Sequence, residues 1–410
     1  MKIVHFISHF PYPDQLSNPA LTDRYVCSGG EWAAHHLIEE QAKAGHDVSV
    51  VASSVTRADV LEQRAGFAVR RYGSWFKIGE TLFAPGMFFR PVTDIGKPDI
   101  VHVHHTTPPG GMAGLACNRT WKSPLVVTHH GFENPDSYGS WIRRAAVFLS
   151  AKYFVGRLFS AANRIVYISP AFVRHSRFLG KYISKSISIP HGIHPAEYPI
   201  HLPVEQARRE LGLTPEGHYG LFVGTLIPPK GLGVLLRALP EVLEKYPDFH
   251  LLVLGRGPSE PEFRQQAADL GVSGNVQFVG FIGEARKKFL YYRASDVLVI
   301  PSFLSEMHCF VLYEGAAAGC CIVTSDLDVF MRVIDDRING MLTKAGDHAE
   351  IAKVLAEVLG NKELQQRLMR GARSQIPLLS WTEVAKRTDH LYASLLKEEP
   401  DRTMQKNKPQ

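Results

Sequence analysis

Short apolar runs alternate along the chain with segments in which hydrophobic residues recur at helical spacing. Apolar runs of this length, bounded by turn residues, are typical of buried strands. Strands that alternate with helices build a mostly parallel, doubly wound sheet. In the first half the pattern predicts strands at 2–8, 48–53, 100–104, 125–130 and 164–169, and the segment 186–193 ends this half.

The alternation starts again after a stretch rich in proline and histidine that ends near residue 205. The second series of predicted strands is 219–224, 249–255, 276–280, 296–300 and 321–324. We therefore expect an N-terminal Rossmann-like domain over residues 1–200 and a C-terminal one over 201–380. A helix at about 381–397 is expected to pack back on the first domain, and the polar residues 398–410 are expected to be disordered.

Composition and cysteine usage are those of an ordinary globular chain. Of the 410 residues, 45% are hydrophobic and 21% are charged. No apolar run reaches the roughly 18 residues that span a bilayer, and the first residues lack the layout of a signal peptide. The five cysteines show neither metal-binding nor redox spacing. A cytoplasmic protein with reduced thiols is expected.

Positive charge is concentrated in the first half. Residues 1–200 hold 21 Lys and Arg against 14 Asp and Glu, and they also hold 13 of the 19 histidines. This asymmetry favours an anionic partner, such as a phosphate-bearing acceptor or an anionic membrane face. A modestly basic, solvated surface explains the charge equally well. Nucleic acid is disfavoured, because no recognised binding module accompanies the charge.

Two carboxylates mark the most informative stretch of the sequence. An expected strand ends at Pro301 and Ser302, Glu306 follows in a loop, and Glu314 lies at the opening of the next helix. Open α/β sheets bind ligands at the carboxyl ends of their strands. The pair therefore predicts a ligand site, with two solvated carboxylates beside a helix start as the structural alternative.

Glycine-rich loops precede two of the expected helices. The loop 224–231 follows a strand, and the bare N–H groups of the next helix favour a pyrophosphate there. Lys230 in this loop would offset the charge that grows on a leaving diphosphate. Gly29 and Gly30, followed by Glu31, precede another helix N-terminus of the same kind. A solvated lysine and a tight turn are the structural alternatives.

Taken together, these motifs resemble glycosyltransferase family 4, the retaining, nucleotide-sugar-dependent glycosyltransferases with the GT-B fold. The resemblance extends over nearly the whole chain and rests on the joint order of its motifs. It implies an α/β, GT-B architecture in which two Rossmann-like doubly wound domains face each other across a cleft. The motifs are 29–31, 130–131, 189–193, 222–231, 254–258, 278–281, 301–306 and Glu314.

The resemblance also implies roles on the donor side. Lys230 would stabilise the leaving nucleoside diphosphate, Glu306 would bind hydroxyls of the donor sugar, and Glu314 would accept hydrogen bonds from the ribose. The donor would be a UDP- or GDP-sugar, and the chemistry would require no metal or other cofactor. The expected donor contacts are Gly224, Thr225, Lys230, Gly280, Phe281, Glu306, Cys309, Phe310, Val311 and Glu314.

The sequence departs from the family pattern at two donor positions. Thr225 stands where many relatives have an arginine that shares the work of Lys230, and Cys309 stands where glycine is usual. A side chain at Cys309 restricts a loop that glycine would leave free. Both departures bear on the sugar specificity and on whether the chain is active.

On the acceptor side, the resemblance places His130 beside the transferred sugar, through a hydrogen bond, and the 29–31 loop beside acceptor or phosphate. His130, Lys230 and Glu306 are thus the expected catalytic residues, with a buried structural histidine as the alternative for His130. Strand positions alone do not establish a metal site at His102 and His104, and none is expected.

Basic and aromatic residues alternate in the segment 141–164, and a second aromatic stretch lies at 75–89. A helix of this composition would suit a membrane interface and a lipid-linked acceptor. A core helix with solvated cations is the alternative. The residues concerned are Arg143, Arg144, Lys152, Arg157 and Arg164, Trp141, Phe148, Tyr153, Phe154 and Phe159, and upstream Trp75, Phe76, Phe83, Phe88 and Phe89.

We therefore expect a retaining glycosyltransferase that acts on a glycan, lipid-linked or small-molecule acceptor in cell-surface polysaccharide or glycoconjugate synthesis. The partners would be the nucleotide-sugar and this acceptor, with peripheral association at the inner membrane face as an option. Two alternatives stay open: a catalytically degenerate binding subunit, which the departures at Thr225 and Cys309 favour, and a GT-B sugar-nucleotide epimerase.

Overall fold

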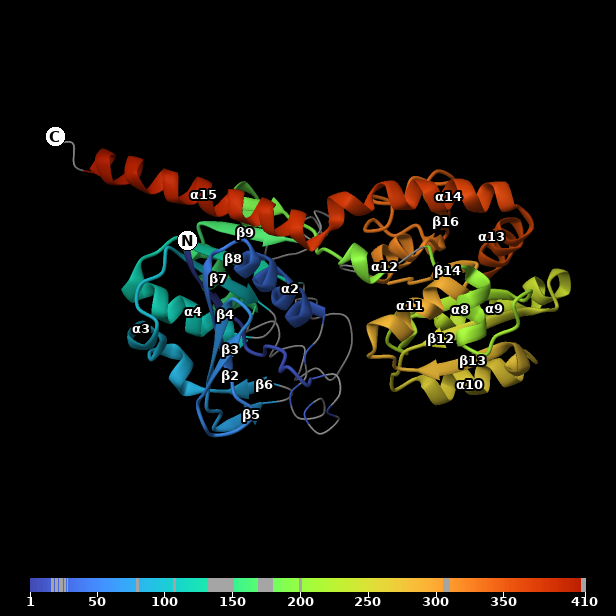
Figure 1. The fold of residues 1–410 in the computed structure, drawn as a ribbon, viewed down its shortest axis with the longest axis horizontal. Coiled ribbons are helices and arrows are strands. Elements are labelled where there is room, and N and C mark those ends of the chain that lie inside the picture. Colours follow the sequence, from blue (N-terminus) through green and yellow to red (C-terminus); the bar gives the residue numbers. More distant parts are fainter. Residues whose placement is uncertain are drawn as a thin grey trace. The chain divides into compact units, whose positions relative to one another are not determined.

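The computed structural model describes residues 1–15, 18, 21, 25, 27, 29–78, 81–105, 108–130, 151–168, 180–198, 201–304 and 310–406. The chain divides into two compact units (Figure 1). The first unit comprises Met1–Gly192 and Trp381–Gln410, and the second comprises Ile193–Ser380. The boundary at Gly192 lies before the predicted boundary at residue 200, within the segment 186–193 that was expected to end the first half.

The first unit is built on an eight-stranded sheet with the order β10-β9-β8-β7-β1-β2-β4-β3. Only the β3–β4 pair is antiparallel among these neighbours. The strands are β1 (Lys2–Phe6), β2 (Asp47–Ser53), β3 (Val60–Arg64), β4 (Phe67–Tyr72), β7 (Ile100–His105), β8 (Leu125–His129), β9 (Arg164–Tyr167) and β10 (Ser186–Ser188). The sequence pattern missed β3 and β4, because β3 is an exposed edge strand without a continuous apolar run.

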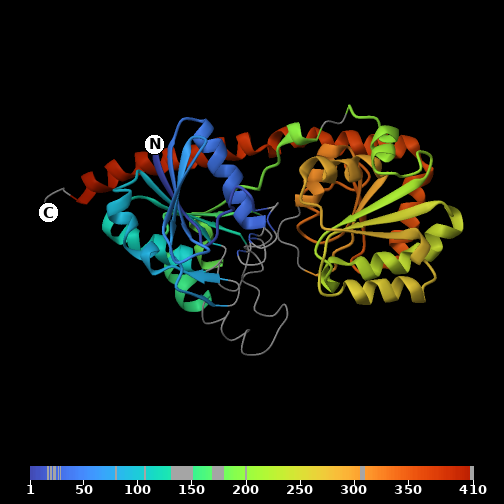
Figure 2. The ribbon, with the colours of Figure 1, turned by 60° about the horizontal axis from the view of Figure 1, so that its bottom comes forward.

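Helices cover both faces of this sheet. The helices α2 (Gly29–Lys43) and α15 (Trp381–Lys406) pack against each other on one face (Figures 1 and 2). The opposite face carries α4 (Pro108–Trp121) and α6 (Gly156–Ala161). Smaller elements are α3 (Pro91–Asp94), the hairpin β5 (Phe76–Ile78) and β6 (Thr81–Phe83), the 3₁₀ helices η1 (Pro85–Phe88) and η3 (Gly180–Lys185), and the π-helix η2 (Ala151–Val155).

The C-terminal helix is longer than the sequence predicts. A helix was expected over about 381–397 and disorder from residue 398, but α15 continues to Lys406. The residues beyond 397 are polar and charged, so composition predicted disorder, yet most of them are good helix formers. The helix joins the first unit through side-chain hydrogen bonds between α2 and α15, in which Thr382 donates to Glu40 and Gln41 donates to Asp389.

The second unit contains a six-stranded, fully parallel sheet with the order β13-β12-β11-β14-β15-β16. Its strands are β11 (His218–Val223), β12 (Phe249–Leu254), β13 (Val276–Gly280), β14 (Val297–Ile300), β15 (Cys321–Ser325) and β16 (Met341–Thr343). Its helices are α8 (Val204–Glu210), α9 (Leu232–Lys245), α10 (Glu260–Asp269), α11 (Ala285–Ala294), α12 (Phe310–Ala318), α13 (His348–Gly360) and α14 (Lys362–Ser374). The remaining short elements are the 3₁₀ helices η4 (Pro195–Glu197), η5 (Pro228–Lys230), η6 (Ser273–Asn275) and η7 (Ile376–Leu379).

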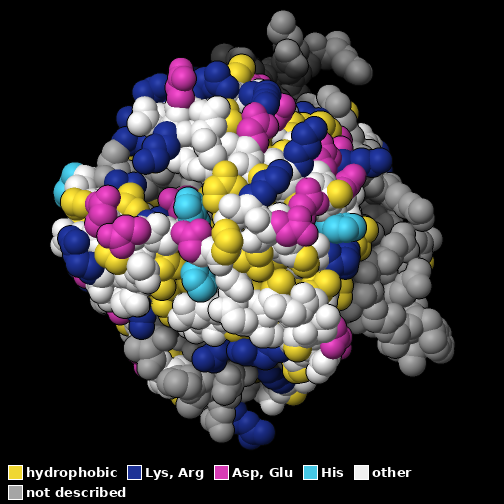
Figure 3. All heavy atoms as spheres, turned by 90° about the vertical axis from the view of Figure 1, so that its right-hand side faces the viewer, with side chains coloured by type: hydrophobic (Ala, Val, Ile, Leu, Met, Phe, Trp, Pro, Cys, Tyr) yellow, Lys and Arg dark blue, Asp and Glu magenta, His cyan; other side chains and the backbone are white. Residues whose placement is uncertain are grey.

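Separate hydrophobic cores fill the two faces of this second sheet. One core joins α9, α10 and α13 to residues such as Leu251 and Val299, and the other joins α11 and α12 to their strand neighbours Leu252 and Leu298. Because successive strand residues point to opposite faces, this alternation confirms the predicted doubly wound architecture. Figure 3, which looks onto the second unit, shows Lys and Arg scattered among Asp and Glu over its surface.

Each sheet reverses its strand order at one central point. In the first unit β1 lies between β2 and β7, and in the second β11 lies between β12 and β14. Loops that leave such a pair of strands diverge to opposite faces, so a crevice forms at their carboxyl ends, where open α/β sheets bind ligands. The candidate site residues gather at these two switch points.

Candidate active site

At the switch point of the second unit, the Lys230 loop is fixed against the loop that follows β14. Gly231 adopts a left-handed φ of +80°, and a Cβ there would lie 1.9 Å from the carbonyl oxygen of Pro301. The Phe303 amide donates a hydrogen bond to the Pro229 carbonyl at 3.1 Å. The predicted phosphate loop is therefore held directly beside the segment that leads to Glu306.

Glycines at the ends of the neighbouring strands form a second close contact. The Gly224 amide donates a hydrogen bond to the Leu254 carbonyl, and the Gly255 amide donates one to the Gly280 carbonyl, each at 2.9 Å. A Cβ on Gly255 would lie 1.9 Å from the Gly224 carbonyl oxygen. The Gly255–Gly257 motif thus allows two loops to approach each other, and the strand ends expose backbone rather than side chains.

Two expected donor contacts flank this glycine-lined edge. Thr225 is exposed directly after Gly224. Phe281 follows Gly280 and its side chain is 56% exposed. An exposed aromatic ring beside backbone N–H and C=O groups suits a nucleobase, which offers both a flat face and a polar edge.

Glu314 was expected at the opening of a helix but lies in the middle of α12, where α11 holds it. Its carboxylate accepts hydrogen bonds from Lys288 Nζ and from the Tyr292 hydroxyl, each at 2.6 Å. Burial and the nearby Glu314 charge raise the pKa of Tyr292, so this hydroxyl stays protonated and donates. The sequence analysis missed Lys288 and Tyr292, although their spacing of four places both on one helix face.

Glu306 and Cys309 lie outside the described residues, which resume at Phe310. Phe310 and Val311 form the first turn of α12, so their N–H groups are at a helix N-terminus, as an anion site requires. The roles given to these four residues remain predictions.

At the switch point of the first unit, His130 follows β8 and is hydrogen-bonded on both sides. Its Nε2 lies 3.1 Å from His104 Nδ1, and its Nδ1 lies 3.1 Å from His191 Nε2. His104 in turn contacts His5, with 2.9 Å between His104 Nε2 and His5 Nδ1. Burial, aided by the charge of His105, lowers the pKa of His130 to about 3, so the ring is neutral at physiological pH.

The sequence singled out His130 but missed its partner His191, and it missed His5 as the partner of His104. Parallel pairing of β1 and β7 sets His5 beside His102, and the twofold alternation puts His104 on the same face. His105 points to the opposite face, where its Nδ1 lies 3.1 Å from His129 Nδ1.

Two groups of side chains in the first unit have a geometry that a metal ion could use. Nitrogens of His5, His102 and His104 lie within 4.8 Å of one another, as do the ligand atoms of His35, His36 and Glu39 on α2. His102 is already hydrogen-bonded, to the Tyr392 hydroxyl and to Thr128 Oγ1. The expectation that no metal takes part stays a prediction.

Gly29, Gly30 and Glu31 differ from their expected arrangement. They were predicted to form a loop before a helix, but Gly29 and Gly30 are the first residues of α2, and Glu31 is buried in its first turn. The unsatisfied N–H groups of a helix start therefore belong to these residues themselves. Their contact with acceptor or phosphate stays a prediction.

Comparison with known proteins gives this architecture a family. The description "Glycosyltransferase Family 4" matches residues 27–197, and "Glycosyl transferases group 1" matches residues 203–375. The chain belongs to glycosyltransferase family 4. The family assignment confirms the expected resemblance and the expected enzyme class, a glycosyltransferase.

Named relatives of this family 4 chain act on inositol compounds. It is 28% identical over 367 residues to phosphatidyl-myo-inositol mannosyltransferase of Mycolicibacterium smegmatis, covering 88% of each protein. It is 29% identical to D-inositol 3-phosphate glycosyltransferase of Acidothermus cellulolyticus, over 74% of this chain and 68% of that protein.

Solved structures agree on the GT-B fold. Sucrose-phosphate synthase from Thermosynechococcus elongatus superposes with a TM-score of 0.74 at 19% identity, covering 97% of this chain and 100% of the other. HepE from Anabaena, solved with UDP and glucose, has a TM-score of 0.71 at 18% identity and covers 96% and 100%. The expected GT-B fold class is confirmed.

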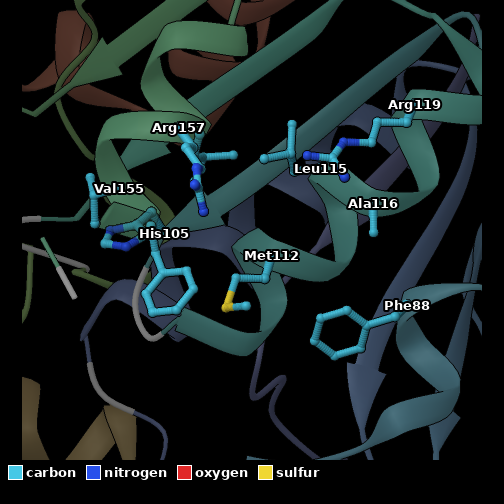
Figure 4. A pocket seen from close by; sticks show the side chains of 10 residues that line it. Phe88, His105, Met112, Leu115, Ala116, Arg119, Val155 and Arg157 are labelled. Carbon is cyan, nitrogen blue, oxygen red and sulfur yellow. The ribbon is translucent and has the colours of Figure 1, made fainter. Parts of the chain in front are cut away.

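The first unit of this glycosyltransferase also contains a pocket of about 240 Å³ between α4 and the η2–α6 segment (Figure 4). Apolar side chains, among them Met112, Leu115 and Phe154, form its walls, and Arg119 and Arg157 contribute to its lining. Neither arginine forms an ion pair within the described part of the chain. An apolar pocket that is also lined by two guanidinium groups suits an anionic amphiphile.

Aromatic rings continue from this pocket across the neighbouring surface. Phe88 lines the pocket and lies 5.6 Å from Phe83, which stacks on Phe76 of the β5–β6 hairpin. Trp75 is 68% exposed and Phe89 is 63% exposed. The segment with Trp141, Arg143, Arg144 and Phe148 lies outside the described residues. Among the described residues, no helix has the length and apolarity needed to cross a membrane.

Proposed function

We propose that this chain transfers a sugar, with retention of anomeric configuration, from a UDP- or GDP-sugar to an acceptor hydroxyl. The observation that carries the proposal is the contact of the Lys230 loop with the Pro301–Phe303 loop, through Gly231 and the 3.1 Å Phe303–Pro229 hydrogen bond. A cation and a helix N-terminus meet there at the switch point. The UDP and glucose bound by HepE, which shares this fold, support a nucleotide-sugar donor.

In the proposed reaction the bond between the anomeric carbon and the diphosphate oxygen breaks while the acceptor oxygen attacks from the same face. The acceptor proton passes to the departing phosphate oxygen. Lys230 and the N–H groups at the start of α12 stabilise the charge that develops on the diphosphate. Glu314, held by Lys288 and Tyr292, accepts hydrogen bonds from the ribose, and Glu306 binds the sugar.

We further propose a lipid-linked acceptor, reached by peripheral association with the inner membrane face. The phosphatidyl-myo-inositol substrate in the name of the mycolicibacterial relative supports an anionic lipid. Arg119 and Arg157 in the pocket would attract the negative charge of such a lipid. The exposed rings of Trp75 and Phe89, in the same unit, suit the membrane interface.

A panel of nucleotide-sugars, monitored for release of nucleoside diphosphate with and without lipid acceptors, tests the transferase proposal. Lys230→Ala should lower kcat by about 100-fold or more, because it removes a cation from the leaving group. Lys287→Ala on α11, an exposed lysine of the same unit, is the matched control and should be neutral. Donor binding without turnover in the wild type would instead support the binding-subunit alternative.

Sedimentation with vesicles tests the membrane proposal separately. Vesicles with about 30% anionic lipid, which approximate an anionic leaflet, should bind the wild-type protein at low salt. The double substitution Arg119→Gln and Arg157→Gln should reduce the bound fraction several-fold. A matched pair in the second unit, Arg237→Gln and Lys245→Gln, removes the same charge and should not. Equal binding by both pairs would contradict a role for the pocket.

A further inference from the structure

A continuous row of hydrogen-bonded imidazoles runs through the first unit to His130. It joins His5 to His104 at 2.9 Å, His104 to His130 at 3.1 Å, and His130 to His191 at 3.1 Å. At each step the Nδ1 of one ring faces the Nε2 of the next, so His104 and His130 use both of their nitrogens within the row. The row crosses three strands of one sheet face, from β1 through β7 to the end of β8.

The inner end of the row is anchored on helices α2 and α15. Gln41 Nε2 donates a hydrogen bond to Asp389 Oδ1 at 2.9 Å, so the amide oxygen of Gln41 remains available to accept one. This oxygen and His5 Nε2 are both buried, and among the described residues neither of them has a hydrogen-bond partner. The Gln41 side chain is close enough to His5 to affect the pKa of its ring. Because both atoms are otherwise unpaired, a hydrogen bond from His5 Nε2–H to the Gln41 oxygen would satisfy the two together.

These contacts determine where each proton lies, because a neutral imidazole carries a single N–H. With Gln41 as acceptor, His5 holds its proton on Nε2 and accepts on Nδ1 from His104 Nε2–H. His104 then accepts on Nδ1 from His130 Nε2–H. His130 in turn accepts on Nδ1 from the Nε2–H of His191.

The rings of His5, His104 and His130 are neutral at physiological pH. Burial lowers the pKa of His5 to about 3 and lowers the pKa of His104 well below its usual range. The reverse order of protons would set the bare His5 Nε2 against the Gln41 oxygen. Two buried acceptors would then face each other without a proton, which is unfavourable.

We propose that Gln41 and Asp389, acting through His5 and His104, are positioning residues that hold His130 in its Nε2–H tautomer. His130 then presents Nδ1 as a hydrogen-bond acceptor on the side of His191. This is the principle by which a carboxylate sets the tautomer of a functional histidine, extended here over three further side chains. The catalytic consequence rests on the proposed function, whereas the tautomer does not.

The assignment gives the C-terminal helix a role in an N-terminal site. Asp389 lies on α15, and the same helix provides Tyr392, whose hydroxyl bonds His102 beside the row. His102 stacks on His104, with ring centroids 4.3 Å apart, and limits its rotation. Removal of α15 would therefore change the tautomer of His130, although no residue of α15 contacts His130 within the row.

Nitrogen NMR of the full-length protein with ¹⁵N-labelled histidine tests the tautomer directly. The His130 signals are assigned by their loss in His130→Gln. In the wild type we expect Nε2 to be protonated and Nδ1 to be unprotonated. Gln41→Met removes the acceptor at similar volume, and a mixture of His130 tautomers should result. An unchanged His130 tautomer in folded Gln41→Met would overturn the proposal.

Kinetics of the same variants test the consequence. Gln41→Met should lower kcat by about 10-fold, the low end for groups that orient a functional histidine, while the donor KM stays unchanged. His46→Gln is the control, because His46 also contacts Asp389, at 3.1 Å, but is not part of the row. A mixed tautomer with unchanged kcat would show that the row is only structural and would refute the positioning role.

A double exchange supplies the rescue. Gln41→Glu together with Asp389→Asn returns a donor at 389 and an acceptor at 41, so the direction of the row is restored. The His130 tautomer and kcat should recover to within about threefold of wild type, whereas a merely structural defect would not be repaired. If the wild type transfers no sugar, the proposed function fails and the NMR experiment still decides the tautomer.

Discussion

The two switch points have the same topology and opposite chemistry. In the second unit the edges of β11, β12 and β13 end in Gly224, Gly255 and Gly280, so backbone groups are exposed. In the first unit β1 and β7 carry the buried His5 and His104 near their carboxyl ends, and the partly exposed His130 follows β8. The side chains of these residues are hydrogen-bonded from ring to ring.

This difference matches the two kinds of ligand that the proposed reaction requires. Backbone N–H groups and Lys230 favour a polyanion, and glycine lets the chain approach it closely. Neutral imidazoles suit an uncharged hydroxyl, because they accept or donate a hydrogen bond without attracting a competing ion. The two units thus have the same strand topology at their switch points, and the residues at the strand ends determine which ligand each switch point favours.

The largest effect is expected from a methyl group at the second switch point. In Gly231→Ala the added Cβ would lie 1.9 Å from the Pro301 oxygen, so the Lys230 loop must separate from the loop after β14. We expect a loss of about 3 kcal/mol or more in unfolding free energy and a drop of more than about 100-fold in nucleoside diphosphate release. Urea titration and the donor assay measure the two effects.

Gly271→Ala is the control for backbone strain. Gly271 has a similar φ of +71°, but a Cβ there meets no atom within 4 Å. It should cost about 1–2 kcal/mol and leave turnover unchanged. Similar turnover in the two alanine variants would show that the contact with Pro301 is unimportant for the site.

Acid should distinguish the first unit from the second. Burial lowers the pKa of His5 and of His130 to about 3 and that of His105 to about 4, against about 6.5 in the unfolded chain. Below pH 6.5 the unfolded state therefore binds more protons, and stability present above that pH is lost as the pH falls toward 3–4. Each histidine contributes about 1.4 kcal/mol per pH unit.

Tryptophan fluorescence isolates this effect, because all five tryptophans belong to the first unit. The fluorescence transition should occur at higher pH than the loss of the remaining helical circular dichroism. The described histidines of the second unit are at least partly exposed, so its stability should depend less on pH in this range. Coincident transitions would contradict the contrast between the units.

Periodicity predicted most strands of the two large sheets, but it missed β3, β4 and β16, and it did not predict which strands lie side by side. The run at 249–255 was found because its residues from Leu251 to Leu254 are apolar on both faces, as in a buried parallel strand. The run at 100–104 was found although His102 and His104 alternate with apolar residues. The edge strand β3 was missed because its residues are mainly polar and exposed. Strand order, and hence the position of the switch points, depends on packing that no local pattern contains.

The candidate site was predictable where a motif carries its own geometry. Lys230 and Gly231 were identified from the loop sequence, and the structure adds the contact with Pro301 that explains the glycine. His5 and Lys288 were missed, because each meets its partner only through register or helix packing over long sequence separations. Such contacts require the assembled sheet.

A smaller effect is expected at the clamp on Glu314. In Lys288→Met the Glu314 carboxylate loses its ion pair but keeps its interactions with the hydroxyls of Tyr292 and Tyr198, at a site that is only partly open to water. We expect a loss of about 1–2 kcal/mol in unfolding free energy and an increase of a few-fold in donor KM, because the ribose acceptor loses its fixed position. Lys287→Met is the neighbouring control. An unchanged KM would remove Glu314 from the donor site.

The smallest effect tests whether the second switch point can be made more cationic. Thr225 is exposed beside Gly224, where many family members have an arginine. Thr225→Arg would add a second cation near the diphosphate, and Lys230 would then share the developing charge. We expect kcat to rise about threefold, and Thr225→Gln, of similar length but neutral, to leave it unchanged. The gain should vanish in the Lys230→Ala background if the two cations act on the same leaving group, whereas an independent gain would mean that the introduced guanidinium acts on another part of the donor.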